Sequence, residues 1–139
     1  MIRVETLTMK KFIFALISFF MIPNAMAEWI PVGESDEDGG YTVYVDLISA
    51  RKAANRVKMW TLIDYKIEQK ASGTNFLSKK IRRDYDCKEE QMRDLAFSLF
   101  SWNMEKGELL RSYNQPQQWQ RVSPGSLNEA EWKAACEQK

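Results

Sequence analysis

The sequence contains no histidine and only two cysteines among its 139 residues. Without histidine, the chain cannot build a Ser-His-Asp or Cys-His nucleophile arrangement or a histidine-containing zinc site, and it lacks the usual acid–base group for neutral pH. Its formal net charge is only +1, which argues against a protein held on nucleic acid by phosphate neutralisation. We therefore expect no enzyme, no cofactor, no metal and no nucleic-acid partner.

The composition that remains is typical of a globular protein. Hydrophobic residues make up 45% of the chain and charged residues 28%, which excludes a disordered or fibrous protein. A chain of this length predicts one domain with one modest core.

The first 27 residues have the features of a secretory signal peptide. Two lysines precede an apolar run over residues 12–22, and small residues two apart end the segment at Ala27. The run is too short for a membrane span, which takes about 20 residues, and polar residues follow it at once. We expect translation to start at Met9, because a methionine followed by two lysines is itself a normal signal-peptide start.

Removal of the signal peptide would leave residues 28–139 as a single domain with no membrane span. This domain is expected to be exported, to the periplasm, the cell surface or the medium. No cysteine lies near the predicted cleavage site, so the chain is not expected to be a bacterial lipoprotein.

Cys87 and Cys136 are the only cysteines, and both belong to the exported part. An even number of cysteines in an oxidising compartment predicts a disulfide bond. A redox-active pair would normally show a Cys-x-x-Cys spacing, which is absent here.

Alternating apolar and polar residues between turn-forming segments predict β-strands. They are expected over residues 28–32, 41–46, 57–67, 76–87, 92–102 and 108–113, with a basic connection over residues 50–56 and a turn over residues 72–75. The apolar spacing of residues 92–102 also fits a helix, but the hairpin-like residues 103–107 that follow favour a strand.

A helix is predicted near the C-terminus. Ser126 and Glu129 form a capping box, and Leu127 begins a run with helical apolar spacing that reaches Cys136. The expected fold class is therefore α+β: an antiparallel sheet of about five to six strands, one C-terminal helix and one disulfide bond.

The densest cluster of positive charge lies on the expected strand over residues 76–87. Its members are Lys79, Lys80, Arg82 and Arg83, supported by Arg51, Lys52, Arg56 and Lys58 earlier in the chain. Such a cluster can bind an acidic polysaccharide, a phospholipid headgroup or an acidic protein through its summed field. The alternative is a charged edge strand that resists pairing with other chains, and it is the favoured of the two.

Two acidic groups are weaker candidates. Glu34, Asp36 and Asp38 fit the first positions of an EF-hand loop, but valine stands at the twelfth position in place of the bidentate glutamate, which favours a solvated turn. Asp84 and Asp86 lie two apart, as paired acid–base carboxylates could, although nothing in the sequence places them in a cleft.

The chain has five tryptophans, which is many for its length. Tryptophan is common both in cores and in interfaces. For Trp60 and Trp119 we expect core packing, because each indole ring can bury a large apolar area.

Several short motifs are spread over the chain. They are Trp29, Tyr44-Val45-Asp46 with Ser49, residues 57–62, residues 79–87, residues 119–126 and Cys136. In this order, with these cysteine positions, they resemble the surface-adhesin protein E-like domain family of Gram-negative bacteria. The resemblance implies an antiparallel sheet flanked by a helix, a disulfide from the sheet to the C-terminal segment, and no enzymatic activity.

The resemblance also implies a function. The member that gives the family its name engages host extracellular-matrix and serum proteins at the outer surface, so the chain is expected to be an exported binding protein. The alternative is a soluble periplasmic protein with an envelope or stress-related role, whose partner is an envelope component.

Overall fold

The computed structural model describes residues 27–137 of the chain. The expected translation start at Met9 and the expected signal peptide, apart from Ala27, lie outside these residues.

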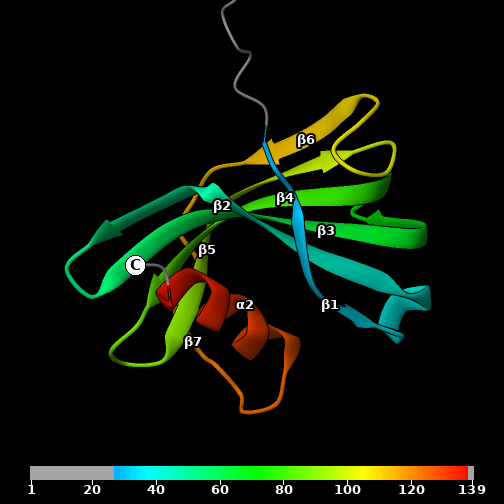
Figure 1. Ribbon diagram of the computed structural model, residues 1–139. Coiled ribbons are helices and arrows are strands. Elements are labelled where there is room, and N and C mark those ends of the chain that lie inside the picture. The colour runs from blue at the N-terminus through cyan, green and yellow to red at the C-terminus, as the bar shows by residue number, and fades with distance from the viewer. Residues whose placement is uncertain (1–26, 138–139) are drawn as a thin grey trace, which may run out of the picture.

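One antiparallel sheet dominates the described part of the chain (Figure 1). Six strands follow one another across it in chain order: β1 (Ile30–Ser35), β2 (Tyr41–Ala53), β3 (Arg56–Ala71), β4 (Thr74–Asp86), β5 (Gln91–Phe100) and β6 (Leu109–Tyr113). A short seventh strand, β7 (Gln120–Arg121), pairs with the beginning of β5. The strand expected over residues 92–102 is confirmed, and the strand count exceeds the expected five to six because of β7.

Several strands are longer than expected, and β3 in particular continues to Ala71. The basic connection predicted over residues 50–56 is mostly strand, because β2 and β3 stay paired until Ala53 lies opposite Arg56. Only Ala54 and Asn55 form the turn of this hairpin. The first strand runs through Gly33 to Ser35, where the sequence suggested a turn, and the short 3-10 helix η2 (Glu37–Gly39) follows it.

Glycine at position 33 has a packing reason. A Cβ atom built on Gly33 would overlap the side chain of Leu127, the first residue of the C-terminal helix α2 (Leu127–Cys136). The missing side chain therefore lets the start of α2 approach β1 closely.

The turn between β3 and β4 is a two-residue hairpin loop, shorter than the predicted turn over residues 72–75 because Thr74 and Asn75 already belong to β4. Ser72 and Gly73 both have positive φ, 49° and 81°. This combination is typical of a type I′ turn, whose twist matches that of the flanking strands.

Helix α2 begins and ends as predicted. The hydroxyl of Ser126 accepts a hydrogen bond from the backbone N–H of Glu129 at 3.2 Å, and the Glu129 carboxylate accepts one from the N–H of Gly125. The first contact satisfies a backbone donor that a helix start leaves without a partner, and the second ties Glu129 to the residue before the N-cap. The antiparallel sheet with its C-terminal helix agrees broadly with the α+β class.

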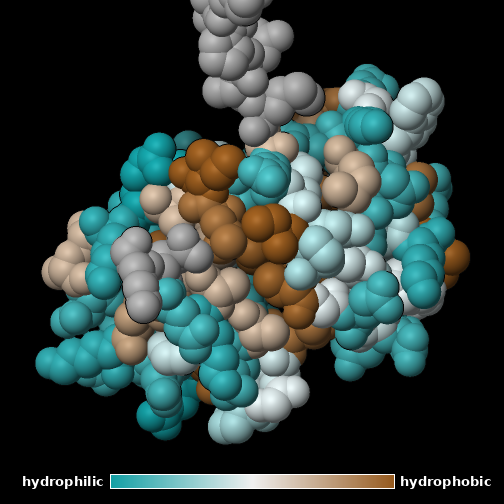
Figure 2. Space-filling model, viewed as in Figure 1, coloured by the Kyte–Doolittle hydropathy of each residue, from teal (hydrophilic) through white to brown (hydrophobic). Residues whose placement is uncertain are grey.

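The core lies between α2 and one face of the sheet. Its buried side chains are Val45, Val57, Met59, Tyr85, Met92 and Ala135. Figure 2 shows apolar side chains gathered between β1 and α2 on this side of the molecule. Since α2 is the one helix longer than a single turn among residues 27–137, the other face of the sheet has no helix over it.

The predicted disulfide is confirmed. Cys87, directly after β4, is bonded to Cys136 at the end of α2, and their Cα atoms are 5.6 Å apart. Next to it, the indole N–H of Trp132 donates a hydrogen bond to the backbone carbonyl of Asp86 at 3.0 Å. The C-terminal half of α2 is thus held to the end of β4 by a covalent bond and a hydrogen bond.

Replacing both Cys87 and Cys136 by alanine should lower the free energy of unfolding by about 2–4 kcal/mol, because the bond closes a loop of 49 residues in the unfolded chain. Urea unfolding followed by tryptophan fluorescence measures this difference. A loss below about 1 kcal/mol would show that the bond contributes little to stability.

Burial of the Tyr65 phenol makes the free energy of unfolding depend on pH in alkaline solution. The Tyr65 ring lies 5.6 Å from that of Tyr41 and 5.7 Å from that of Phe76, and burial raises the pKa of Tyr65 to about 12. The unfolded chain binds fewer protons than the folded chain above about pH 10, so stability should fall as the pH rises from about 10 to about 12. The free energy of unfolding, measured in urea across this pH range, should fall less steeply for Tyr65→Phe than for the parent chain. Equal slopes would contradict a raised pKa of Tyr65.

Candidate ligand-binding face

The four clustered cations of β4 do not form one patch. Successive side chains of a strand point to opposite faces of the sheet, and β4 is regularly paired with β3. Lys79 and Arg83 therefore share the face of Tyr85, against which α2 packs, whereas Lys80 and Arg82 lie on the opposite face. The edge-strand interpretation is wrong, because β4 is hydrogen-bonded to β3 on one side and to β5 on the other.

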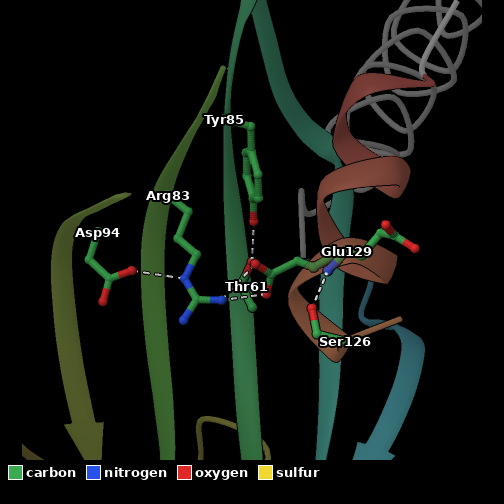
Figure 3. A network of polar contacts seen from close by, with 7 residues as sticks. Thr61, Arg83, Tyr85, Asp94, Ser126 and Glu129 are labelled. Atoms are coloured by element: carbon green, nitrogen blue, oxygen red, sulfur yellow. Dashed lines mark hydrogen bonds and ion pairs between the residues drawn. The ribbon is translucent and has the colours of Figure 1, made fainter. Parts of the chain in front are cut away.

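Arg83 is committed to the interior (Figure 3). Its Nε donates to Asp94 at 2.9 Å, and its Nη1 lies 2.6 Å from both carboxylate oxygens of Glu131, a helix residue only 1% exposed. Burial by itself disfavours the charged guanidinium, but Glu131 and then Asp94 outweigh it and raise the pKa of Arg83 above its usual range. Arg83 therefore joins α2 to the sheet and is not free to bind a ligand.

Tyr85 and Lys79 share the sheet face of Arg83, and both make contacts within the protein. The hydroxyl groups of Tyr85 and Thr61 lie 2.9 Å apart in the core, and burial raises the pKa of Tyr85 (Figure 3). Lys79 lies 4.6 Å from the centre of the Phe97 ring, and burial lowers the pKa of its amine. Neither Lys79 nor Arg83 thus adds to an exposed positive surface.

The opposite face carries the other two cations around an aromatic ring. Lys80 and Arg82 lie 4.6 and 5.6 Å from the centre of the Trp60 ring, and Lys80 also forms an ion pair with Glu105 at 2.7 Å. Trp60 is only partly buried and lies outside the core cluster, so the expectation of core packing is wrong for it. The physical reason is that α2 covers only one face of the sheet.

Trp119 has a similar place beside a buried carboxylate. Asp84 has no exposed surface and accepts hydrogen bonds from Arg56 and Arg93. Both guanidinium groups lie over the Trp119 ring, that of Arg56 at 5.0 Å and that of Arg93 at 4.4 Å from the ring centre. Core packing is therefore wrong for Trp119 as well.

Asp84 and Asp86 do not form an acid–base pair. Asp84 is paired with two arginines, whereas the carboxylate of Asp86 accepts the backbone N–H groups of Glu89 and Lys88, which lowers its pKa. Both carboxylates hold local structure.

A bulge in β2 shapes the helix-free face. Between two paired positions, β2 advances five residues (46 to 51) while β3 advances two (60 to 58). Ser49 closes this bulge, since its hydroxyl accepts the backbone N–H of Trp60 at 3.0 Å and donates to the carbonyl of Asp46 at 2.6 Å. After the bulge, Arg51 lies directly opposite Lys58. Bulges commonly redirect side chains in this way.

These side chains surround an open hollow of about 590 Å³ at the β2–β3 hairpin. Its lining consists of five cations and two alanines: Arg51, Lys52, Ala53, Ala54, Arg56, Lys58 and Arg82. Four of the five were recognised in the sequence only as support for the cluster on β4. The sequence analysis did not bring Arg51 and Lys58 together. Their pairing depends on the extra residues of the bulge in β2, which strict strand alternation does not predict.

The acidic residues considered for an EF-hand loop lie in different elements. Glu34 belongs to β1, and Asp36 precedes η2. Among residues 27–137, no three His, Cys, Asp or Glu side chains gather as a metal ion would require. Within the same residues, no helix is long and apolar enough to cross a membrane.

Comparison with known proteins places this architecture in a family. The sequence model of the family described as Surface-adhesin protein E matches residues 29–137. A search of the curated proteins found no match.

Three solved structures of protein E from Haemophilus influenzae have the same fold. Crystal form II gives a TM-score of 0.59 at 10% identity, covering 68% of this chain and 80% of that one. The protein from a non-typeable strain gives 0.57 at 11% identity, covering 82% and 80% of the two chains. A further structure gives 0.56 at 11% identity, covering 81% and 87%. At these identities the likeness concerns the fold alone.

Glu131→Gln should lower the free energy of unfolding by about 3 kcal/mol, the lower end for breaking a buried ion pair, because Asp94 still faces Arg83. The double variant Arg83→Met with Glu131→Leu should recover most of this loss, since it removes both deeply buried charges and leaves unpaired only Asp94, whose side chain is 30% exposed to water. Urea unfolding of both variants tests this. A double variant as unstable as the single one would contradict a charge effect.

Proposed function

The chain belongs to the surface-adhesin protein E family, and on that premise we propose that it is an exported, non-enzymatic binding protein that engages host extracellular-matrix or serum proteins. Residues 1–27 would act as the signal peptide and residues 28–139 as the binding domain. The observation that carries the proposal is the family match over residues 29–137, which spans nearly all of the proposed mature chain.

The division of the sheet into two faces supports a binding role. One face is occupied by α2 and the core, whereas the other presents Lys80, Arg82 and Trp60 without a covering helix. Tryptophan and arginine are the residue types that most often dominate the binding energy of protein interfaces. Of the four cations first considered, we assign ligand contact to Lys80 and Arg82, because Lys79 and Arg83 face the interior side.

A second candidate is a soluble periplasmic protein that binds an envelope component. It is favoured by one observation: the two cysteines of the sequence are bonded to each other, so neither is available to carry a lipid. The two candidates differ in whether the domain is exposed to the cell exterior.

Protease treatment of intact cells tests this difference, with the chain followed by immunoblot. We expect the chain to be degraded in intact cells, because an adhesin must reach its host ligand. Permeabilised cells serve as the control that the protease can cleave the chain. Protection until the outer membrane is permeabilised would contradict the adhesin and favour the periplasmic candidate.

Binding of the purified chain to a panel of immobilised matrix and serum proteins is the second arm of the same test. Lys80→Gln with Arg82→Gln should weaken the binding of any captured protein several-fold. Lys66→Gln with Lys70→Gln is the matched control, because it removes the same charge from two exposed side chains. Equal binding by both double variants would contradict the assignment to Lys80 and Arg82.

A further inference from the structure

The hollow at the β2–β3 hairpin concentrates five cations, of which only Arg82 belongs to the pair assigned above to protein contact. We propose that this hollow binds a sulfated polysaccharide, whose anionic groups lie between Arg51, Lys58 and Arg82. The inference rests on the proposed function in one respect, which is that the chain must be exposed where such polymers occur.

The charges of the hollow are largely uncompensated. Arg56 is paired with Asp84, but Lys52, Lys58 and Arg82 form no ion pair with any carboxylate in residues 27–137. No acidic residue lines the hollow. Cations held this close together repel one another, so an anion bound among them would lower the energy of the folded chain.

The positions of the three central cations are set by the sheet. Arg51 lies opposite Lys58, and Arg82 lies opposite Trp60, which is two residues from Lys58 on the same face of β3. Neighbouring strands are about 4.8 Å apart, and residues two apart on a strand are about 6.6 Å apart. Three charges within such spans match a ligand with several closely spaced anionic groups.

Two of these side chains are already held in place. The guanidinium of Arg51 donates to the backbone carbonyls of Ile48 and Ala50, both at 2.9 Å, and that of Arg82 lies 5.6 Å from the Trp60 ring centre. Side chains that are fixed before binding lose less conformational entropy when the ligand arrives. The hollow is therefore a better anion site than a set of freely moving surface lysines.

Charge and shape favour a polysaccharide over other polyanions. A nucleic-acid binder needs an extended basic footprint, whereas here the positive charge is local and the whole chain carries only +1. The site is concave, whereas a bilayer of anionic lipid presents a flat surface. A single flexible chain that bears sulfate groups can enter the hollow.

The test is a calorimetric titration of the full chain, expressed with its own N-terminal segment and purified with the disulfide intact, with a heparin octasaccharide. We expect binding that weakens as salt is raised from about 0.05 M to about 0.5 M, because salt screens exposed charges. A fully desulfated octasaccharide should not bind. Arg51→Gln with Lys58→Gln and Arg82→Gln should weaken binding by about tenfold or more.

The matched control is Lys66→Gln with Lys70→Gln and Lys106→Gln, which removes three charges from exposed lysines outside the hollow. It should bind the octasaccharide as the parent chain does. Absence of binding, or equal losses in both triple variants, would overturn the proposal. Equal or tighter binding of a DNA duplex or of phosphatidylglycerol vesicles, lost in the same hollow variant, would replace the polysaccharide by that ligand.

This experiment is independent of the cellular one. Octasaccharide binding by a chain that is protected in intact cells would leave the site in place and refute the adhesin. Exposure at the cell surface without octasaccharide binding would support the adhesin and refute the polysaccharide site.

Discussion

The ion pair between Arg83 and Glu131 holds α2 at one position on the core face of the sheet. It joins the middle of α2 to the C-terminal part of β4, and the bond from Cys87 to Cys136 holds the end of the same helix. Burying two charges is costly, and it is tolerated only when they meet in good geometry, so a helix displaced along the sheet would leave a charge without a partner. Apolar side chains alone, which tolerate sliding, would define the position of α2 less sharply.

The position of α2 in turn leaves the second face of the sheet to polar and aromatic groups. There the charges are arranged by local pairing: Asp84 holds two arginines beside Trp119, and Trp60 holds Lys80 and Arg82. The pairing stops at the β2–β3 hairpin, where cations remain without carboxylates. Groups that maintain the fold therefore lie on both faces, whereas the cations without a carboxylate partner gather at the hairpin on the face that α2 leaves uncovered.

Much of this architecture could be predicted from local sequence patterns, because the decisive interactions were local. Ser126 and Glu129 marked the helix start, and the two cysteines left one pairing. Strand alternation says which residues share a face, but it does not say what covers that face or where a bulge interrupts the alternation. Lys79 and Lys80 are neighbours in sequence and lie on opposite sides of the molecule. Trp60 and Trp119 were placed in the core by their size alone, and the bulge at Ser49 depends on a hydrogen bond to a strand eleven residues away.

That bulge has an evolutionary consequence. Because Ser49 absorbs the extra residues of β2 at one point, the register on the core side of the bulge is independent of the register in the hairpin beyond it. Insertions, deletions and charge changes in the hairpin can then accumulate in relatives without shifting Val45 out of the core. The bulge thus separates a variable hairpin from the part of β2 that packs in the core.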